Sequence, residues 1–432
     1  MAFKTVHNLS LRAAARFLVC SVLVCCSRLT DVDAPDLVTP DRVGNAAGAE
    51  ALRIGAINGF ALVFAGAENG QITTSGAIAD EFYNASTAVI SLAYADIRLL
   101  PEPSTSYPYR NLQRARLDIE RAIAAKQQFA PNPPSKIAEL FALSAYTRDF
   151  LGENMCSGIP LGEIVDGDLV FGEPLTTTQL FEDAVANFDS SITYATDSAR
   201  FLNLAKVGKG RALLNLGRFA EAAAAVSTVP TSFTYMTYHA PIVQPNGVFA
   251  IINNSKWLTV ADQEGVNGLN FRSAGDPRVP TAYVGKGVDQ LVDVYTFTRY
   301  GSLSAPIVLA SGIEARLIEA EALLKAGNAA GELAILNDLR ATMPGLAPLT
   351  QPATLDQQID QLFRERAFWM FATGHRHGDL RRLVRQYLRS PEAVFPTGPY
   401  KNGATYGTDV SFPPDNTQLG NPNYKGCLST GA

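Results

Sequence analysis

The chain has 432 residues, of which 47% are hydrophobic and 18% are charged, and its formal charge is −5. This balance is typical of a globular protein and argues against a disordered one. The length allows a large buried core and more than one domain. The net negative charge also makes nucleic-acid binding a poor interpretation.

The first residues have the pattern of a bacterial export signal. Lys4, Arg12 and Arg16 precede a short apolar core at residues 17–24, and no acidic residue occurs before Asp31. The core is too short to span a bilayer. Removing the signal takes away three positive charges and no negative one, which leaves a formal charge of −8. A buried N-terminal helix is the alternative interpretation.

The sequence Leu-Val-Cys-Cys, which ends at Cys26, resembles a lipoprotein cleavage box. We therefore expect residues 1–25 to be a lipoprotein signal peptide and Cys26 to carry a lipid that anchors the chain to a membrane. Residues 26–44 contain Pro35 and Pro40 and are predicted to form an extended, proline-stiffened tether.

Two cysteines, Cys156 and Cys427, lie far from the signal region. In an exported protein, two such cysteines can pair, because the compartment is oxidising. We therefore predict a disulfide between Cys156 and Cys427.

Much of the chain has the apolar periodicity of helices. The expected helices are at about 45–65, 77–100, 109–127 and 135–150, with another capped by Thr177 or Thr178. Residues 199–225 and 313–340 resemble tetratricopeptide hairpins, turning at Gly217 and at Gly327.

Two further helices are predicted near the C-terminus. Residues 355–371 carry one apolar face, Gly374 suits a helix C-cap, and a second helix opens near Asp379. Arg381, Arg385 and Arg389 fall four residues apart on that second helix, so we expect their stripe to face solvent or an acidic partner.

Several motifs together resemble one known family. Glu365-Arg366, Gly374-His375-Arg376 and Asp379-Leu380 with Arg382 are similar to the C-terminal signature of SusD/RagB-like nutrient-binding lipoproteins. Asp276-Pro277-Arg278, a tyrosine-rich strand and a helical hairpin precede the signature in the family's order.

The resemblance implies a mostly α fold, in which tetratricopeptide-like helical pairs form a scaffold beside an irregular, loop-rich lobe with short strands. We expect one domain at residues 45–432. Its predicted parts are the scaffold at about 45–229 and 310–389, the irregular lobe at about 230–309 and a loop-rich tail at 390–432.

The resemblance also implies a non-enzymatic protein, anchored by lipid at the outer membrane of a Gram-negative bacterium. Such a protein captures an oligosaccharide, or a peptide, and passes it to a SusC-like TonB-dependent transporter. The residues alone leave two other classes open, a helical-repeat adaptor that binds protein partners and a secreted hydrolase that uses scattered carboxylates.

No convincing catalytic, cofactor or metal motif occurs in the sequence. His375 and His377 are two residues apart, a spacing that points them in different directions on a helix, and a structural cap is the favoured interpretation. The acidic loop from Glu163 to Glu173 lacks the spacing of a helix-loop-helix calcium site.

Aromatic residues amid polar ones are the candidate ligand-binding positions, because sugar rings stack their C–H faces on aromatic rings while their hydroxyl groups need polar partners. We predict Tyr107 and Tyr109, beside Arg110, and Trp257 in the irregular lobe, with Tyr83 behind them. Each tyrosine could instead pack with its hydroxyl at the surface.

Overall fold

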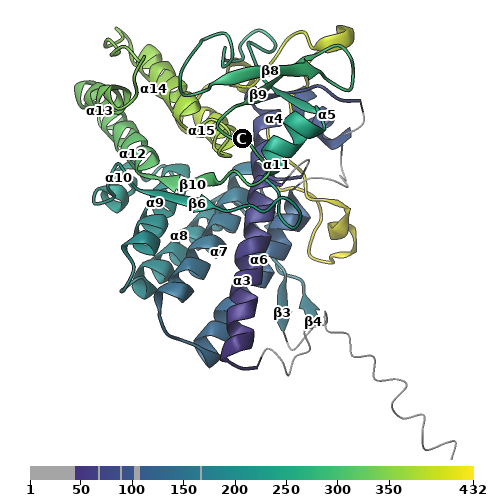
Figure 1. Ribbon diagram of the computed structural model, residues 1–432, viewed down its shortest axis with the longest axis vertical. Coiled ribbons are helices and arrows are strands. Elements are labelled where there is room, and N and C mark those ends of the chain that lie inside the picture. The colour runs from purple at the N-terminus through teal and green to yellow at the C-terminus, as the bar shows by residue number, and fades with distance from the viewer. Residues whose placement is uncertain (1–43, 67–68, 88–89, 102–107, 166–167) are drawn as a thin grey trace, which may run out of the picture. The chain divides into compact units, whose positions relative to one another are not determined.

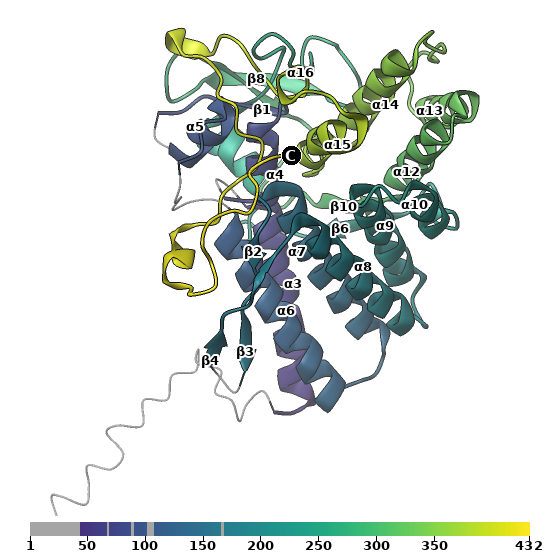
Figure 2. The same cartoon turned by 180° about the vertical axis from the view of Figure 1, so that it is seen from behind.

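The computed structural model describes residues 44–66, 69–87, 90–101, 108–165 and 168–432. Several predicted features lie outside these residues: the predicted signal peptide, Cys26, the predicted tether up to residue 43, and Tyr107. Figures 1 and 2 show a largely helical body in which the strands are short.

A row of antiparallel helices forms the scaffold. The helices are α3 (Ala46–Ala65), α6 (Tyr109–Phe129), α7 (Ser135–Asn154), α8 (Thr177–Tyr194), α9 (Ala199–Asn215), α10 (Phe219–Val226), α12 (Gly312–Lys325) and α13 (Ala329–Ala341). Each one packs on the next, so α10 contacts α12 although the residues of the irregular lobe separate them in sequence (Figure 2). The predicted scaffold of helical pairs is therefore confirmed.

Caps and glycine turns fix the ends of these helices. The N-cap of α8 is Thr176, which forms a capping box with Gln179. The sequence predicts the cap at Thr177 or Thr178, so the helix begins slightly earlier than predicted. Gly217 (φ +73°) and Gly327 (φ +79°) make the turns after α9 and α12, as predicted. This left-handed conformation is strained for residues that carry a side chain. Glycine adopts it without that strain and therefore suits the position after both helices.

Helix α3 is long and apolar enough to cross a membrane by length and composition alone. In the fold, however, it packs against α6 and α7. Its Phe60 and Phe64 are buried against Phe150 of α7, with ring centroids 6.2 and 5.7 Å away. Helix α3 is therefore part of the core of the domain.

The single helix predicted at residues 77–100 is wrong. The chain instead forms α4 (Gln71–Ile78), β1 (Phe82–Asn84) and α5 (Ile90–Ile97). The Asn84 side chain accepts a hydrogen bond from the Ser86 amide and donates one to its carbonyl, which stabilises a turn. Pairing of β1 with a distant strand overrides the local helical pattern, and no local pattern reveals that pairing.

All the sheets among the described residues are antiparallel pairs. They are β1 with β7 (Leu258–Val260), β6 (Thr234–Thr237) with β10 (Ile307–Ser311), β2 (Ile159–Pro160) with β5 (Pro174–Leu175), β3 (Glu163–Val165) with β4 (Asp168–Val170), and β8 (Thr281–Lys286) with β9 (Asp293–Phe297). The lobe also holds α11 (Gly247–Phe249) and the π-helix η2 (Ala250–Asn254).

The irregular lobe shares the core of the scaffold. Phe271 and Phe297 of the lobe both contact Phe371, which follows α14 (Leu355–Trp369), with ring centroids 4.9 and 5.1 Å apart. A second, smaller apolar cluster joins α12, α13, α14 and α15 (Arg376–Tyr387). The two clusters hold the C-terminal helices against the lobe and the scaffold.

The arginine stripe of α15 is not a solvent-facing stripe. Arg381 is 1% exposed, and its Nη1 donates to the carbonyls of Gly152, Glu153 and Met155 at distances of 3.0, 2.8 and 3.0 Å. The C-terminal end of α7 leaves these carbonyls unsatisfied by its own helix, so a buried guanidinium caps them. Among the three arginines of the stripe, Arg389 meets acidic partners at the surface.

The tail continues through α16 (Pro391–Val394), η3 (Lys401–Gly403) and η4 (Asn416–Gly420). Between η3 and η4 the tail runs along the C-terminal end of α7, where the Cys156 amide donates to the Phe412 carbonyl at 2.9 Å. A disulfide joins Cys156 to Cys427 across 271 residues of sequence. The tail is therefore tied covalently to the first half of the scaffold.

Candidate ligand-binding site

Three tyrosine rings gather where β1 meets the tail, and we call Tyr83, Tyr400 and Tyr406 the tyrosine cluster. The ring of Tyr400 lies 5.5 Å from that of Tyr83 and 5.1 Å from that of Tyr406, with interplanar angles of 66° and 76°. Successive side chains of a strand point to opposite faces, and Phe82 and Asn84 on either side of Tyr83 are buried. Tyr83 therefore points away from the core. Tyr83 and Tyr400 are half-buried, so each keeps part of its ring accessible.

Charged groups surround the tyrosine cluster. The Tyr400 hydroxyl donates to Asp96 at 2.6 Å, and burial raises the pKa of Asp96 to about 7 although that hydrogen bond lowers it. The Lys401 ammonium lies 2.9 Å from the Asp289 carboxylate and 5.5 Å from the centre of the Tyr83 ring. The cluster therefore combines aromatic faces with a fixed cation and two carboxyl groups.

The β8–β9 hairpin carries two more tyrosine rings. Tyr283 and Tyr295 are directly opposite each other in the hairpin, with ring centroids 5.5 Å apart, and Tyr283 is 56% exposed. Asp289, in the turn of this hairpin, donates its amide hydrogen to the Ala85 carbonyl at 3.1 Å. The hairpin is thereby held beside β1 and Lys401.

The backbone of two of the predicted ligand residues runs close together. Tyr83 belongs to the tyrosine cluster, and the Trp257 carbonyl accepts a hydrogen bond from Ala85 at 2.8 Å, next to the β1–β7 pair. The Trp257 ring is partly buried against the main core. Tyr109 lies elsewhere: it is 1% exposed at the start of α6, and its hydroxyl donates to the Pro160 carbonyl at 3.0 Å.

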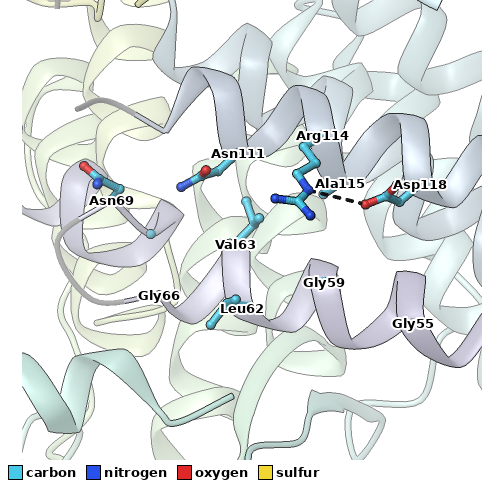
Figure 3. Close-up of a pocket in the computed structure, with 11 residues that line it drawn as sticks. Gly55, Gly59, Leu62, Val63, Gly66, Asn69, Asn111, Arg114, Ala115 and Asp118 are labelled. Atoms are coloured by element: carbon cyan, nitrogen blue, oxygen red, sulfur yellow. Dashed lines mark ion pairs between the residues drawn. The ribbon is translucent and has the colours of Figure 1, made fainter. Parts of the chain in front are cut away.

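A separate cavity of about 470 Å³ lies between α3 and α6 (Figure 3). Gly55, Gly59 and Leu62 of α3 face Arg114 and Asp118 of α6 across it. Arg114 and Asp118 form an ion pair of 3.9 Å. No aromatic ring is among the described residues that line this cavity, so it offers no stacking surface for a sugar.

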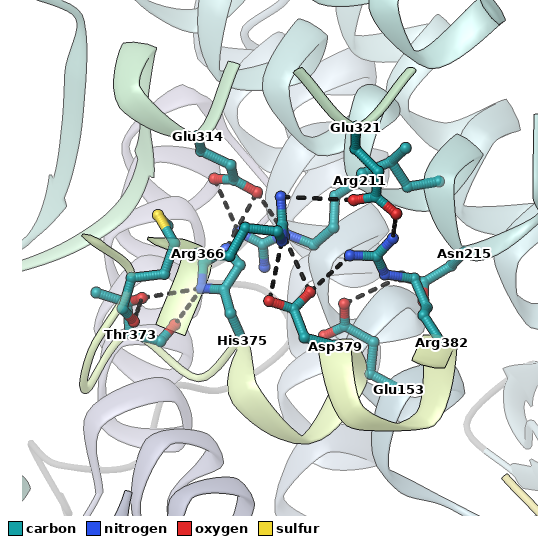
Figure 4. A network of polar contacts seen from close by, with 12 residues as sticks. Glu153, Arg211, Asn215, Glu314, Glu321, Arg366, Thr373, His375, Asp379 and Arg382 are labelled. Atoms are coloured by element: carbon teal, nitrogen blue, oxygen red, sulfur yellow. Dashed lines mark hydrogen bonds and ion pairs between the residues drawn. The ribbon is translucent and has the colours of Figure 1, made fainter. Parts of the chain in front are cut away.

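The signature residues form a buried network of charges (Figure 4). Arg366 donates twice to Asp379, at 3.0 and 2.9 Å, and Arg382 donates to Asp379 at 2.7 Å and also to Glu321. These four side chains are at most 5% exposed. Burial acts to raise the pKa of Asp379, but the two arginines lower it below its ordinary value.

His375 of the signature and the nearby His377 are also engaged in structural contacts. His375 Nε2 lies 3.0 Å from Glu314, which in turn pairs with Arg211 at 2.8 Å. His377 lies 3.0 Å from the Asn154 amide oxygen and 2.9 Å from the Val410 carbonyl, and burial lowers its pKa to about 3. Among the described residues, no group of three or more His, Cys, Asp or Glu side chains is placed to hold a metal ion.

Solved structures of one superfamily share this architecture. A SusD superfamily protein from Parabacteroides distasonis superposes with a TM-score of 0.68 at 14% identity, covering 91% of this chain and all of that one. NanU of B. fragilis gives 0.62 at 13% identity, covering 89% and 96%. A SusD-like carbohydrate binding protein from Bacteroides vulgatus gives 0.54 at 12% identity, covering 78% and 83%. No family model and no curated protein matches the sequence.

This chain has the SusD fold. The sequence resemblance drawn from the Glu-Arg and Gly-His-Arg motifs therefore leads to the correct architecture. In this chain the motifs hold the fold together: Glu365 accepts hydrogen bonds from Arg278 of the Asp-Pro-Arg turn and from Arg340 of α13.

Sequence reasoning missed two residues of the tyrosine cluster and its cation. Tyr400, Tyr406 and Lys401 come from the tail, which the sequence marks as a loop-rich segment without periodicity. The one available signal was the closely spaced Tyr-Lys-Asn-Gly segment, which has the composition of a turn. The tertiary fold, and no local pattern, places this segment beside Tyr83.

Proposed function

We propose that this protein is a non-enzymatic nutrient-binding lipoprotein of the cell surface, which captures an oligosaccharide. The observation that carries the proposal is the tyrosine cluster beside Lys401 and Asp289, on a SusD fold. Aromatic faces pack on the C–H faces of sugars, and fixed charged groups bond to hydroxyl groups. A peptide is the alternative ligand, because the same mixture of rings and charges also suits peptide side chains and backbone.

The absence of catalysis is part of the proposal. The two carboxyl groups beside the tyrosine cluster are both engaged, Asp289 by Lys401 and Asp96 by the Tyr400 hydroxyl and the Asn84 amide. A glycosidase needs two carboxyl groups that flank one scissile bond, about 5 to 10 Å apart. We therefore expect bound oligosaccharides to be recovered intact.

The site is tested by calorimetric titration of the purified chain with a panel of neutral oligosaccharides and of peptides. Tyr83→Ala and Trp257→Ala should each weaken binding of the ligand that the panel identifies. Tyr238→Ala is the matched control, because Tyr238 is 63% exposed and is not part of the tyrosine cluster. Binding that neither Tyr83→Ala nor Trp257→Ala weakens would place the ligand elsewhere, and accumulation of cleaved product would overturn the non-enzymatic proposal.

The anchor and the partner belong to the same proposal. We infer that residues 1–25 are removed, that Cys26 carries the lipid, that residues 26–44 form the tether and that residues 45–432 form one domain at the outer membrane. A SusC-like TonB-dependent transporter would receive the ligand. Mass spectrometry of the mature N-terminus tests the anchor, and co-purification from native membranes tests the partner.

A further inference from the structure

A cavity of about 320 Å³ lies beside α6 and is also lined by residues of β3 and η4 and by Phe171, just after β4. We call it the α6 pocket. The residues that the argument uses are Arg114, Leu117, Arg121, Ile164, Phe171 and Gln418. This volume is at the lower end of the range for small-molecule sites. The α6 pocket contains none of the residues of the tyrosine cluster.

The wall of the α6 pocket opposite the helix is apolar and accessible. Ile164 is 41% exposed and Phe171 is 37% exposed, although both are large hydrophobic residues. Leu117 of α6 contributes a further half-buried apolar side chain. Together they offer a face on which a flat or ring-shaped ligand can exclude water.

Hydrogen bonds hold the walls of the α6 pocket in place before any ligand arrives. Gln113 donates to the Pro160 carbonyl at 2.8 Å, and Arg116 donates to the Gly162 carbonyl, so the base of the β3–β4 hairpin is fixed to α6. Asn423 donates to the Phe171 carbonyl at 3.1 Å and fixes the tail to the hairpin. A preformed pocket loses less entropy when it binds a ligand.

The helix wall of the α6 pocket is mostly cationic, because it carries four arginines and one carboxylate, that of Asp118. Arg110, Arg114 and Arg121 lie on one face of α6, at spacings of four and seven residues. Arg110 lies 3.7 Å from Asp415 and Arg114 lies 3.9 Å from Asp118. Asp415 is buried, but Arg114 and Asp118 are both exposed. A long, exposed pair such as Arg114–Asp118 contributes about 0 to 1 kcal/mol, so Arg114 exchanges Asp118 readily for a ligand.

Arg116 and Arg121, which also line the α6 pocket, differ in whether they are free to bind a ligand. Arg116 is 2% exposed and its Nη1 bonds both oxygens of Glu120, at 2.9 and 2.8 Å, so it serves the wall itself. Arg121 is exposed and forms no ion pair with any residue that the structure describes. Arg114 and Arg121 are therefore the guanidinium groups best placed to receive an anion.

We propose that the α6 pocket binds a ligand that carries a carboxylate on a compact, partly apolar body, as an acidic sugar does. The carboxylate would bond to Arg114 and Arg121, since guanidinium groups bind carboxylates in a planar, two-pronged manner. The apolar face of the ligand would lie on Phe171 and Leu117. This second site goes beyond the function proposed above, and each of the two can hold without the other.

The test is a calorimetric titration of the purified chain with trigalacturonate, with the neutral sugar α-1,4-galactotriose and with triglutamate, each at low and high NaCl. We expect trigalacturonate to bind more tightly than galactotriose and to weaken as salt rises. The double variant Arg114→Gln/Arg121→Gln should bind trigalacturonate about tenfold more weakly or worse. Phe171→Ala should also weaken it.

The control is Arg218→Gln, which removes an exposed arginine at the start of α10 and should leave the affinity unchanged. Thermal unfolding of every variant separates lost binding from lost folding. Triglutamate binding with the same sensitivity to the double variant would assign the carboxylate to a peptide and support the site. Equal affinity for trigalacturonate and galactotriose, or a double variant that binds as the parent chain does, would overturn the proposal. Neither result bears on Tyr83.

Discussion

The guanidinium of Arg376 forms two hydrogen bonds with the carboxylate of Asp80, from Nε to Oδ1 at 2.5 Å and from Nη2 to Oδ2 at 2.9 Å. The two residues are 296 positions apart in sequence, and both are buried. Asp80 also accepts the Leu269 amide at 2.9 Å. One carboxylate therefore connects the turn after α4, the start of α15 and the irregular lobe.

Replacing Asp80 with Ala should lower the free energy of unfolding by about 3 to 5 kcal/mol, because it leaves the Arg376 charge buried without a partner. Urea unfolding followed by circular dichroism measures the change. Asp356→Ala is the matched control, since Asp356 pairs with Arg389 but is 75% exposed, and we expect a loss below about 1 kcal/mol. Similar losses for the two variants would contradict the structural role assigned to Asp80.

The Asp80–Arg376 pair also illustrates what the sequence could and could not predict. The helical hairpins at Gly217 and Gly327 follow from local periodicity and glycine turns, and the motif around Arg376 leads to the SusD fold. Nothing near Asp80 predicts its partner, since a contact across 296 residues has no local pattern.

The same limit applies to the aromatic positions. Tyr83 and Trp257 stand out in sequence by composition, and the fold places Tyr83 on β1 and Trp257 directly before β7, the strand that pairs with β1. Tyr109 has the same composition around it, yet its ring is buried, because it starts a helix that packs against α3 and α7. Exposure of a ring depends on tertiary packing, which composition alone does not contain.

The disulfide gives a second prediction. Cys427→Ser should lower the free energy of unfolding by about 2 to 4 kcal/mol, because the bond between Cys156 and Cys427 restricts a long loop in the unfolded chain. Guanidinium unfolding of the unreduced protein measures this change. The double variant Cys156→Ser/Cys427→Ser should lose about the same amount as the single one, since both remove one bond.

Thiol labelling in denaturant provides an independent check of the disulfide. The unreduced parent protein should show no reactive thiol at these two positions, and Cys427→Ser should show one, at Cys156. Two labelled thiols at Cys156 and Cys427 in the unreduced parent protein would mean that the bond does not form.

A third prediction concerns the pH dependence of stability. Burial raises the pKa of Glu81 to about 8, against an ordinary value of 4.5, although the Ala372 amide donates a hydrogen bond to it and lowers the pKa. The folded state therefore holds a proton that the unfolded state releases between pH 4.5 and pH 8. The stability contributed by Glu81 is fully present below pH 4.5 and is lost as the pH rises to 8, by about 1.4 kcal/mol per pH unit within this window.

Glu81→Gln removes this titration and keeps an oxygen for the Ala372 amide. The difference in unfolding free energy between the variant and the parent protein should therefore grow in favour of the variant from pH 5 to pH 8. Denaturant unfolding at each pH measures it. Glu163→Gln, at an exposed position of β3, is the control for the exchange of a glutamate for a glutamine. A constant difference for Glu81→Gln would show that Glu81 is ionised in the folded protein.

The last prediction separates the ring of Tyr400 from its hydroxyl group in ligand binding. Tyr400→Phe keeps the ring beside Tyr83 and Tyr406 but removes the donor to Asp96. Without that donor, the lowering effect on the pKa of Asp96 is lost, so Asp96 should be protonated over a wider pH range.

Binding of a neutral oligosaccharide to Tyr400→Phe should therefore stay within a few fold of the parent protein. Tyr400→Ala should weaken it by about tenfold, because one aromatic contact is worth about 0.5 to 1.5 kcal/mol beyond its buried area, and about 1.4 kcal/mol is a factor of ten. Calorimetry at pH 6 and pH 8 measures both. Tyr94→Ala serves as the control, since Tyr94 is 40% exposed and lies on α5, outside the tyrosine cluster. Equal losses for Tyr400→Phe and Tyr400→Ala would assign the contribution of Tyr400 to its hydrogen bond with Asp96. Stacking of the sugar on the Tyr400 ring would then not contribute to binding.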